Sequence, residues 1–325
     1  MRSGVRWGAI GVAVAALVGG GVGVIGFQTR YSSEFSHTVQ GSLDGQSVPM
    51  VEVRLDELPA MTSSRRALDG GRTVELRSNL PVGDPVREQV LHQLAAVYLY
   101  VERESGRPIP GDTLLYVGVV DEIPVSYRIS GRYAGDVPWS HVGFVLIGRL
   151  ENDPVGSPGA PLNRQLYDTI PHELGHSVLR DLVRHDADGG PSHHTRWFLD
   201  GVCEVLAKGF AAEQHRPSAE HFLRRRRLDS LAQPEVRQAL FRWPQDDGPV
   251  ETLESDLYGA AMLVVQLWTR QVPLPTILSR LAEGSSADGE ALVARMSADL
   301  GRDREAILDA ATALGRQTAA SAVDR

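Results

Sequence analysis

The sequence IPHELGHSVL, residues 170–179, places His172 and His176 four positions apart, with Glu173 directly after the first histidine. Residues i and i+4 of an α-helix lie on the same face, so both imidazoles can present a nitrogen to one metal ion. Glu173 is turned about 100° around the helix axis, where it can reach a metal-bound water rather than the metal. The stretch therefore predicts a helix carrying two ligands of a metal site.

The HExxH spacing is weak on its own, because a chain with ten histidines contains it by chance with odds on the order of one in fifty. An amphipathic helix with two chance histidines would read the same way. A catalytic zinc site needs a third protein ligand. The elongated HExxHxxGxxH pattern is excluded, since Leu179 and Leu182 occupy its glycine and histidine positions. With Cys203 as the only cysteine, we expect a ligand set of histidine and carboxylate.

The stretch TRWFLDGVCEVLAKG, residues 195–209, offers the missing carboxylate. Asp200 and Glu204 are four apart, so they share one face of a second helix. HELGH and WFLDGVCE together resemble the gluzincins, the HExxH metallopeptidases that include thermolysin-like enzymes and zinc aminopeptidases. Their second helix reads W-x-x-E-G-x-A-E, and the glutamate before the glycine is the third zinc ligand.

The resemblance implies a Zn²⁺ site made by His172, His176 and Asp200, in which Glu204 orients a ligating histidine. The chain departs from the pattern, because aspartate replaces the ligating glutamate and Cys203 replaces the usual alanine. Two alternatives stay open. Either Glu204 ligates and Asp200 supports it, or the site has decayed and binds metal poorly.

The segment 257–301 is similar to the tail of bacterial peptidase-MA-like families: a tyrosine opens an apolar helix, and shorter helices follow. The resemblance covers residues 162–315. It implies that Tyr258 donates a hydrogen bond to the oxyanion of a peptidase reaction; the alternative is a core tyrosine. Nothing resembles the amine-binding motif of aminopeptidases, so we expect an endopeptidase or a peptidase of unspecified mode.

The patterning predicts an α+β fold, with strands in a front lobe (49–161) and a mainly helical lobe (162–325). The resemblance makes this a zincin-like metallopeptidase domain with a small mixed sheet. The strands are expected at 50–55, 73–80, 113–120 and 141–150. The helices of the second lobe are expected at 164–183, 197–211, 218–230, 255–271, 275–283, 287–299 and 302–315.

A helix is also predicted in the front lobe, with Asp84 as its N-cap and Pro85 at its first position. It should end near Gly106. Its apolar stripe recurs at helical spacing and comprises Val90, Leu94, Val97 and Val101. In the HExxH helix, Pro171 requires either that the helix start near Thr169 or that it bend there.

The N-terminus contains an uncharged apolar segment of 21 residues, 7–27, preceded by Arg2 and Arg6. About 20 apolar residues suffice to cross the hydrocarbon core, and flanking arginines stay in the cytoplasm. We therefore predict a single-pass membrane anchor over 1–30, a flexible tether over 31–48, and a body outside the cytoplasm. A cleaved signal peptide is the alternative.

The net charge of the chain argues against nucleic acid as a partner. The chain has a net charge of −8 and therefore lacks the general excess of basic residues that is typical of nucleic-acid-binding proteins. The run RRRR at 224–227 is interpreted as a solvated helix face. Lys208 is the only lysine, which we attribute to genomic base composition.

The sequence thus predicts a membrane-anchored zinc metallopeptidase acting on a peptide or protein substrate, in which Glu173 accepts a proton from the zinc-bound water. The alternative from another class is a non-catalytic exported domain that uses the zincin fold for binding or assembly. A purely structural zinc site is a weaker third interpretation, because such sites are usually closed by four ligands.

Overall fold

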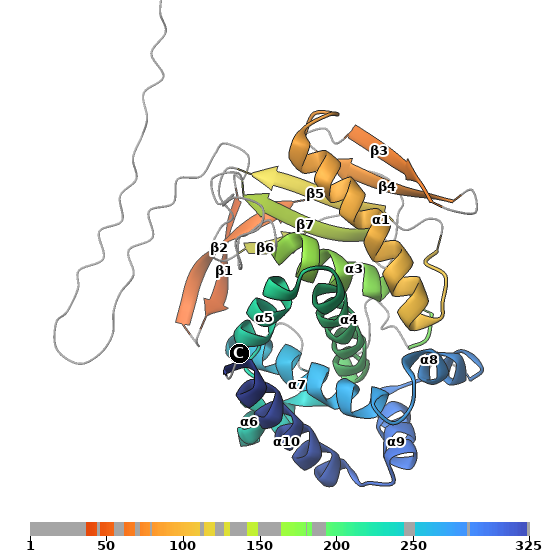
Figure 1. Cartoon of the computed structure of the whole chain (residues 1–325). Helices are drawn as coiled ribbons and strands as arrows, with labels where there is room; N and C mark the ends of the chain where they lie inside the picture. The colour runs from red at the N-terminus through yellow and green to blue at the C-terminus, as the bar shows by residue number, and fades with distance from the viewer. Residues whose placement is uncertain are drawn as a thin grey trace, which may run out of the picture.

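The structure is a computed structural model of mixed α+β class in which helices predominate, as the sequence predicts at the level of fold class. It describes residues 37–43, 46–54, 62–68, 72–78, 80–110, 114–120, 127–130, 142–148, 164–179, 181–183, 193–243, 251–284 and 287–323. Figure 1 shows the strands toward one end of the molecule and helices α6 to α10 toward the other.

Two small sheets are formed by the described strands. One has the order β1-β2-β6, from His37–Leu43, Gln46–Arg54 and Tyr127–Ser130. The other has the order β3-β4-β5-β7, from Thr62–Ala67, Thr73–Ser78, Leu114–Val120 and Val142–Gly148. Strands β4, β5 and β7 run parallel, and α1 forms the crossover from β4 to β5, as a parallel pair requires.

Helix α1 (Pro85–Ser105) follows its sequence signals. The side chain of Asp84 accepts a hydrogen bond from the backbone N–H of Val86 at 2.9 Å, which caps the helix start. Gly106 ends the helix in the left-handed conformation with φ 67°. The predicted apolar stripe is fully buried: Val90, Leu94, Val97 and Val101. The predicted start, end and buried face are confirmed.

The second half of the chain is helical. A π-helical turn, η4 (Gln165–Thr169), leads into α3 (Ile170–Ser177). The remaining helices are α4 (His193–Gln214), α5 (Arg216–Arg225), α6 (Pro234–Leu240), α7 (Glu251–Thr269), α8 (Leu274–Ala282), α9 (Gly289–Leu300) and α10 (Arg304–Val323). Each predicted helical range overlaps one of these helices, with ends that differ by several residues, and α4 packs between α3 and α7.

Pro171 lies in the first turn of α3, directly after the π-helical turn. The chain before Pro171 is already helical, since Thr169 has the αR dihedrals φ −68° and ψ −48°, and the change from π-helical to α-helical spacing comes immediately before the residue that lacks an N–H donor. The α-helix therefore starts beside Thr169, which is the first of the two options that the sequence left. The helix is shorter than predicted and ends at Ser177.

Some elements were not predicted. Strand β1 lies inside the segment predicted as a tether, 31–48, so that prediction is wrong there. The missed signal is Asp44-Gly45 between the paired residues Leu43 and Gln46, a dipeptide typical of two-residue hairpins. Strand β3 is almost entirely exposed and lacks apolar alternation, and the short strand β6 and short helix α6 also escaped prediction.

The segment predicted as a membrane anchor, 1–30, lies outside the described residues. Among the helices that the structure describes, none combines the length and apolarity needed to cross a membrane.

The contact between α4 and α7 depends on Gly201. A Cβ atom at this position would lie 2.7 Å from Cγ2 of Val265 and 2.8 Å from the backbone oxygen of Ala261. Since an oxygen on the α7 backbone cannot rotate away, only glycine permits this helix spacing. Buried aromatic side chains fill the space beside the contact, namely Trp197, Phe198 and Trp268.

We expect Gly201→Ala to destabilise the protein by roughly 1–3 kcal/mol, because α4 and α7 must separate to admit the methyl group. Gly284→Ala is the matched control, since a Cβ there would meet only the backbone oxygen of Leu281 at 3.7 Å. Its effect should stay within about 0.5 kcal/mol. Urea unfolding followed by tryptophan fluorescence measures both, and equal stability of the two variants would contradict the close helix contact.

Candidate metal centre

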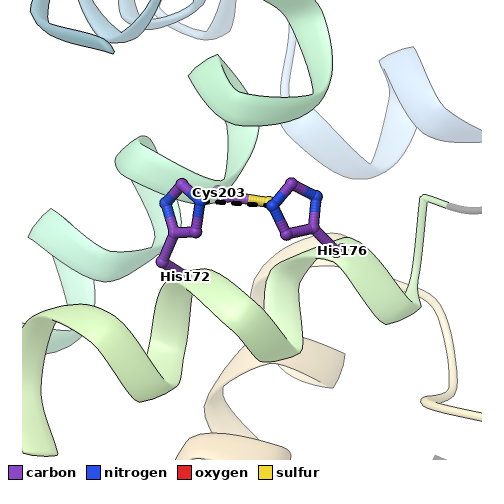
Figure 2. A group of neighbouring side chains, drawn as sticks. All are labelled: His172, His176 and Cys203. Carbon is purple, nitrogen blue, oxygen red and sulfur yellow. Dashed lines mark hydrogen bonds between the residues drawn. The ribbon is translucent and has the colours of Figure 1, made fainter. Parts of the chain in front are cut away.

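Helix α3 presents both histidines of the HELGH sequence on one face. The Nε2 atoms of His172 and His176 lie 3.2 Å apart, and Figure 2 shows the two rings pointing toward each other from successive turns. His172 is buried and His176 is half-buried. The i, i+4 spacing therefore brings the two imidazole nitrogens together as predicted.

Helix α4 places a carboxylate against this pair. Oδ1 of Asp200 lies 3.5 Å from Nε2 of His172 and 3.4 Å from Nε2 of His176. The three atoms thus form a nearly equilateral triangle. Around a tetrahedral ion with bonds of about 2.0–2.1 Å, ligand atoms are separated by about 3.3–3.4 Å. These distances have the size that three ligands of one divalent ion require.

The other oxygen of Asp200 has a different partner. Oδ2 accepts a hydrogen bond from Nε of Arg196 at 3.0 Å, one helical turn earlier on α4. Nη2 of Arg196 also donates to the hydroxyl of Tyr258 at 3.2 Å. Asp200 is consequently held with a single oxygen toward the histidines, and Tyr258, whose ring centroid lies 5.8 Å from that of His172, is held at the edge of the site.

Glu204 lies on the far side of His172. Its Oε1 is 3.1 Å from Nδ1 of His172, although the N–H is not well aligned for a hydrogen bond. Both oxygens of Glu204 accept hydrogen bonds from Arg226, from Nε and Nη2, each at 2.6 Å. Glu204 therefore contacts the nitrogen that faces away from the triangle. Of the two carboxylates, Asp200 has an oxygen within 3.5 Å of both Nε2 atoms, whereas Glu204 contacts Nδ1 of His172.

Arg226 belongs to the run 224–227, which the sequence analysis interpreted as a solvated face. For Arg226 that interpretation is wrong, because its side chain is only 14% exposed and is paired with the buried Glu204. Arg227 keeps a largely exposed side chain and pairs with Asp256. Arg196 was not predicted either, although its i, i+4 spacing to Asp200 is a usable signal.

Cys203 is buried between the two helices. Its Sγ and one nitrogen from each of His172 and His176 all lie within 4.8 Å of one another, so the thiol is a further potential ligand (Figure 2). A Cβ on Gly175 would come within 2.9 Å of this sulfur and 3.2 Å of the Cα of Cys203. The glycine of HELGH thus lets α4 approach α3 closely enough for both helices to contribute to one site.

The charges of the site are strongly coupled. Burial alone would lower the pKa of His172, but the carboxylates of Asp200 and Glu204 outweigh it and raise the pKa to about 10. Burial likewise opposes the charge on Asp200, yet His172, His176 and Arg196 hold its pKa far below the usual range. These charges form an ion-pair network that favours the protonated form of His172. A metal ion that binds there must displace that proton.

Glu173 is half-buried beside the pair of histidines. Its negative charge contributes to the raised pKa of His172. Burial is the main reason that the pKa of Cys203 is well above its usual value, and the charges of Asp200, Glu173 and Glu204 add to it. The structure thus brings together all the predicted site residues: His172, Glu173, His176, Asp200, Glu204 and Tyr258.

No protein-family model matches the chain, and no curated protein sequence matches it significantly.

Zinc titration of the EDTA-treated protein tests the assignment of the two carboxylates. We expect Asp200→Asn to lose stoichiometric binding, because the amide no longer supplies the anionic third ligand. Glu204→Gln should keep one zinc per chain with about 10–100-fold weaker affinity, the usual effect of removing a group that orients a ligating histidine. The reverse order of effects would make Glu204 the ligand.

Proposed function

We propose that this protein is a zinc-dependent metallopeptidase of gluzincin type, held by its N-terminal segment at the outer side of a membrane. The observation that carries the proposal is the triangle of His172 Nε2, His176 Nε2 and Asp200 Oδ1, with edges of 3.2, 3.5 and 3.4 Å. Two imidazoles and one carboxylate are the ligands of catalytic zinc sites, and three protein ligands leave a coordination position open.

Zinc, when bound, supplies a Lewis acid that polarises a carbonyl group and lowers the pKa of water toward about 7. In the proposed reaction, Glu173 accepts a proton from the attacking water and transfers it to the leaving amine of a peptide or protein substrate. Tyr258 donates a hydrogen bond from its hydroxyl to the carbonyl oxygen as negative charge develops there.

The remaining charged residues position this machinery. Arg196 holds Asp200 in a one-oxygen orientation and contacts the hydroxyl of Tyr258, so it links a proposed ligand to a proposed oxyanion donor. Arg226 fixes Glu204, which in turn contacts the outer nitrogen of His172. A ring held from its second nitrogen keeps the orientation and tautomer that ligation requires.

A second candidate function is a structural metal site. The observation in its favour is Cys203 Sγ, which lies within 4.8 Å of a nitrogen of each histidine. Cysteine as a fourth ligand would close the site, and closed four-ligand sites stabilise folds rather than activate water. We favour the open three-ligand site because the oxygen of Asp200 lies within 3.5 Å of both histidine nitrogens, whereas the sulfur of Cys203 belongs to a looser group whose atoms lie within 4.8 Å of one another.

Glu173→Gln tests the peptidase proposal. Glutamine keeps the size of the side chain but cannot accept the proton, so we expect zinc content and folding to persist while peptide hydrolysis falls by about 10²-fold or more. The measurement is hydrolysis of a peptide library alongside zinc content. Equal activity in both proteins would refute the role of Glu173. Zinc bound in both, with no hydrolysis by either, would favour the non-catalytic binding domain.

The proposed topology rests on the uncharged segment 7–27 behind Arg2 and Arg6. We expect the full chain to sediment with membranes and residues 31–325 to be digested when protease is added to intact cells. Recovery of a protected, soluble protein from the cytoplasm would contradict this topology.

A further inference from the structure

A cavity of about 610 Å³ lies where helices α4, α5, α7 and α10 meet. This size falls within the roughly 300–1,000 Å³ of small-molecule sites. Its polar lining includes Lys208 from α4, Gln266 and Arg270 from α7, and Gln317 and Thr318 from α10. None of these residues belongs to the candidate metal centre, so the cavity requires its own explanation.

Lys208 is a half-buried cation in the lining of this cavity. Its Nζ donates a hydrogen bond to Oε1 of Gln266 at 2.9 Å. An ammonium group has three N–H donors, and no carboxylate among the described residues pairs with this one. Burial first, and then the positive charge of Arg270, lower the pKa of Lys208 to about 8. Lys208 is thus held beside a like charge in a partly desolvated position.

The other charges in the lining do not neutralise this pair. Glu220 is paired with Arg216, the two groups being 3.1 Å apart. The guanidinium of Arg270 forms no ion pair with any described residue. Lys208 and Arg270 face one cavity without a carboxylate of their own and repel each other, and an anion between them would relieve this repulsion.

The rest of the lining is apolar and consists of Ala212, Ala219, Leu223 and Leu314. Inorganic ions would leave this surface uncovered, whereas a ligand with an apolar part would bury it. We propose that this cavity binds a small anion consisting of a phosphate or carboxylate group on an apolar body, with the anionic group between Lys208 and Arg270. The proposal is independent of any metal at the histidines.

The single lysine provides a selective probe for the test. In the full chain, solubilised in a non-ionic detergent and grown with ¹³C-labelled lysine, every lysine signal comes from Lys208. Titration with phenyl phosphate should shift the Cε–Hε signal to saturation and raise the pKa of Lys208 by about 1 unit or more, since a nearby anion favours the charged amine.

Arg270→Gln should weaken the binding of phenyl phosphate by at least about tenfold, because one charge-assisted hydrogen bond is lost. Arg302→Gln is the matched control: this exposed arginine lies beyond the other end of α10 and should leave the affinity unchanged. Calorimetry with Lys208→Met gives a second measurement that needs no lysine signal and should show the same loss.

Four results would overturn the proposal. The first is the absence of a saturable shift with phenyl phosphate, and the second is unchanged affinity in Arg270→Gln. The other two concern which part of the ligand is required for binding. If phenol binds as tightly as phenyl phosphate, the site does not require an anionic group. If inorganic phosphate binds as tightly, the site does not require an apolar body.

Discussion

The candidate site depends on how closely α3 and α4 approach each other. At their contact, Gly175 faces Cys203 so tightly that a Cβ would lie 3.2 Å from the Cα of the cysteine. Only this spacing brings a carboxylate of α4 within 3.5 Å of both histidine nitrogens of α3. On its opposite face α4 meets α7 through Gly201, and α7 carries Tyr258. Two glycines thus fix three helices around one group of polar side chains.

Burying so many charges is unfavourable unless each has a partner. Asp200 and Glu204 are both almost completely buried, and each is hydrogen-bonded to an arginine and lies beside His172. Two arginines therefore support two carboxylates around one imidazole. Ionisable groups with strongly shifted pKa values are found preferentially at functional sites. This clustering, together with the triangle of potential ligand atoms, is the physical basis of the proposed function.

The sequence predicted those features that local patterns encode. The face shared by His172 and His176 follows from i, i+4 spacing, and the limits of α1 follow from Asp84 and Gly106. The position of Asp200 was implied by the resemblance to the gluzincins. Arg226 could not be anticipated, because it lies 22 residues from Glu204 and no local pattern connects them. The polar strand β3 was missed because exposed edge strands lack apolar alternation.

We propose that His172, His176 and Asp200 are the protein ligands of one zinc ion. X-ray absorption at the zinc edge of the loaded full-length protein tests it most directly, because it identifies the ligand atoms by distance. We expect a shell of nitrogen and oxygen atoms at about 2.0–2.1 Å, two of them from imidazoles, and no sulfur. A sulfur atom at about 2.3 Å would make Cys203 a ligand and would contradict the open catalytic site.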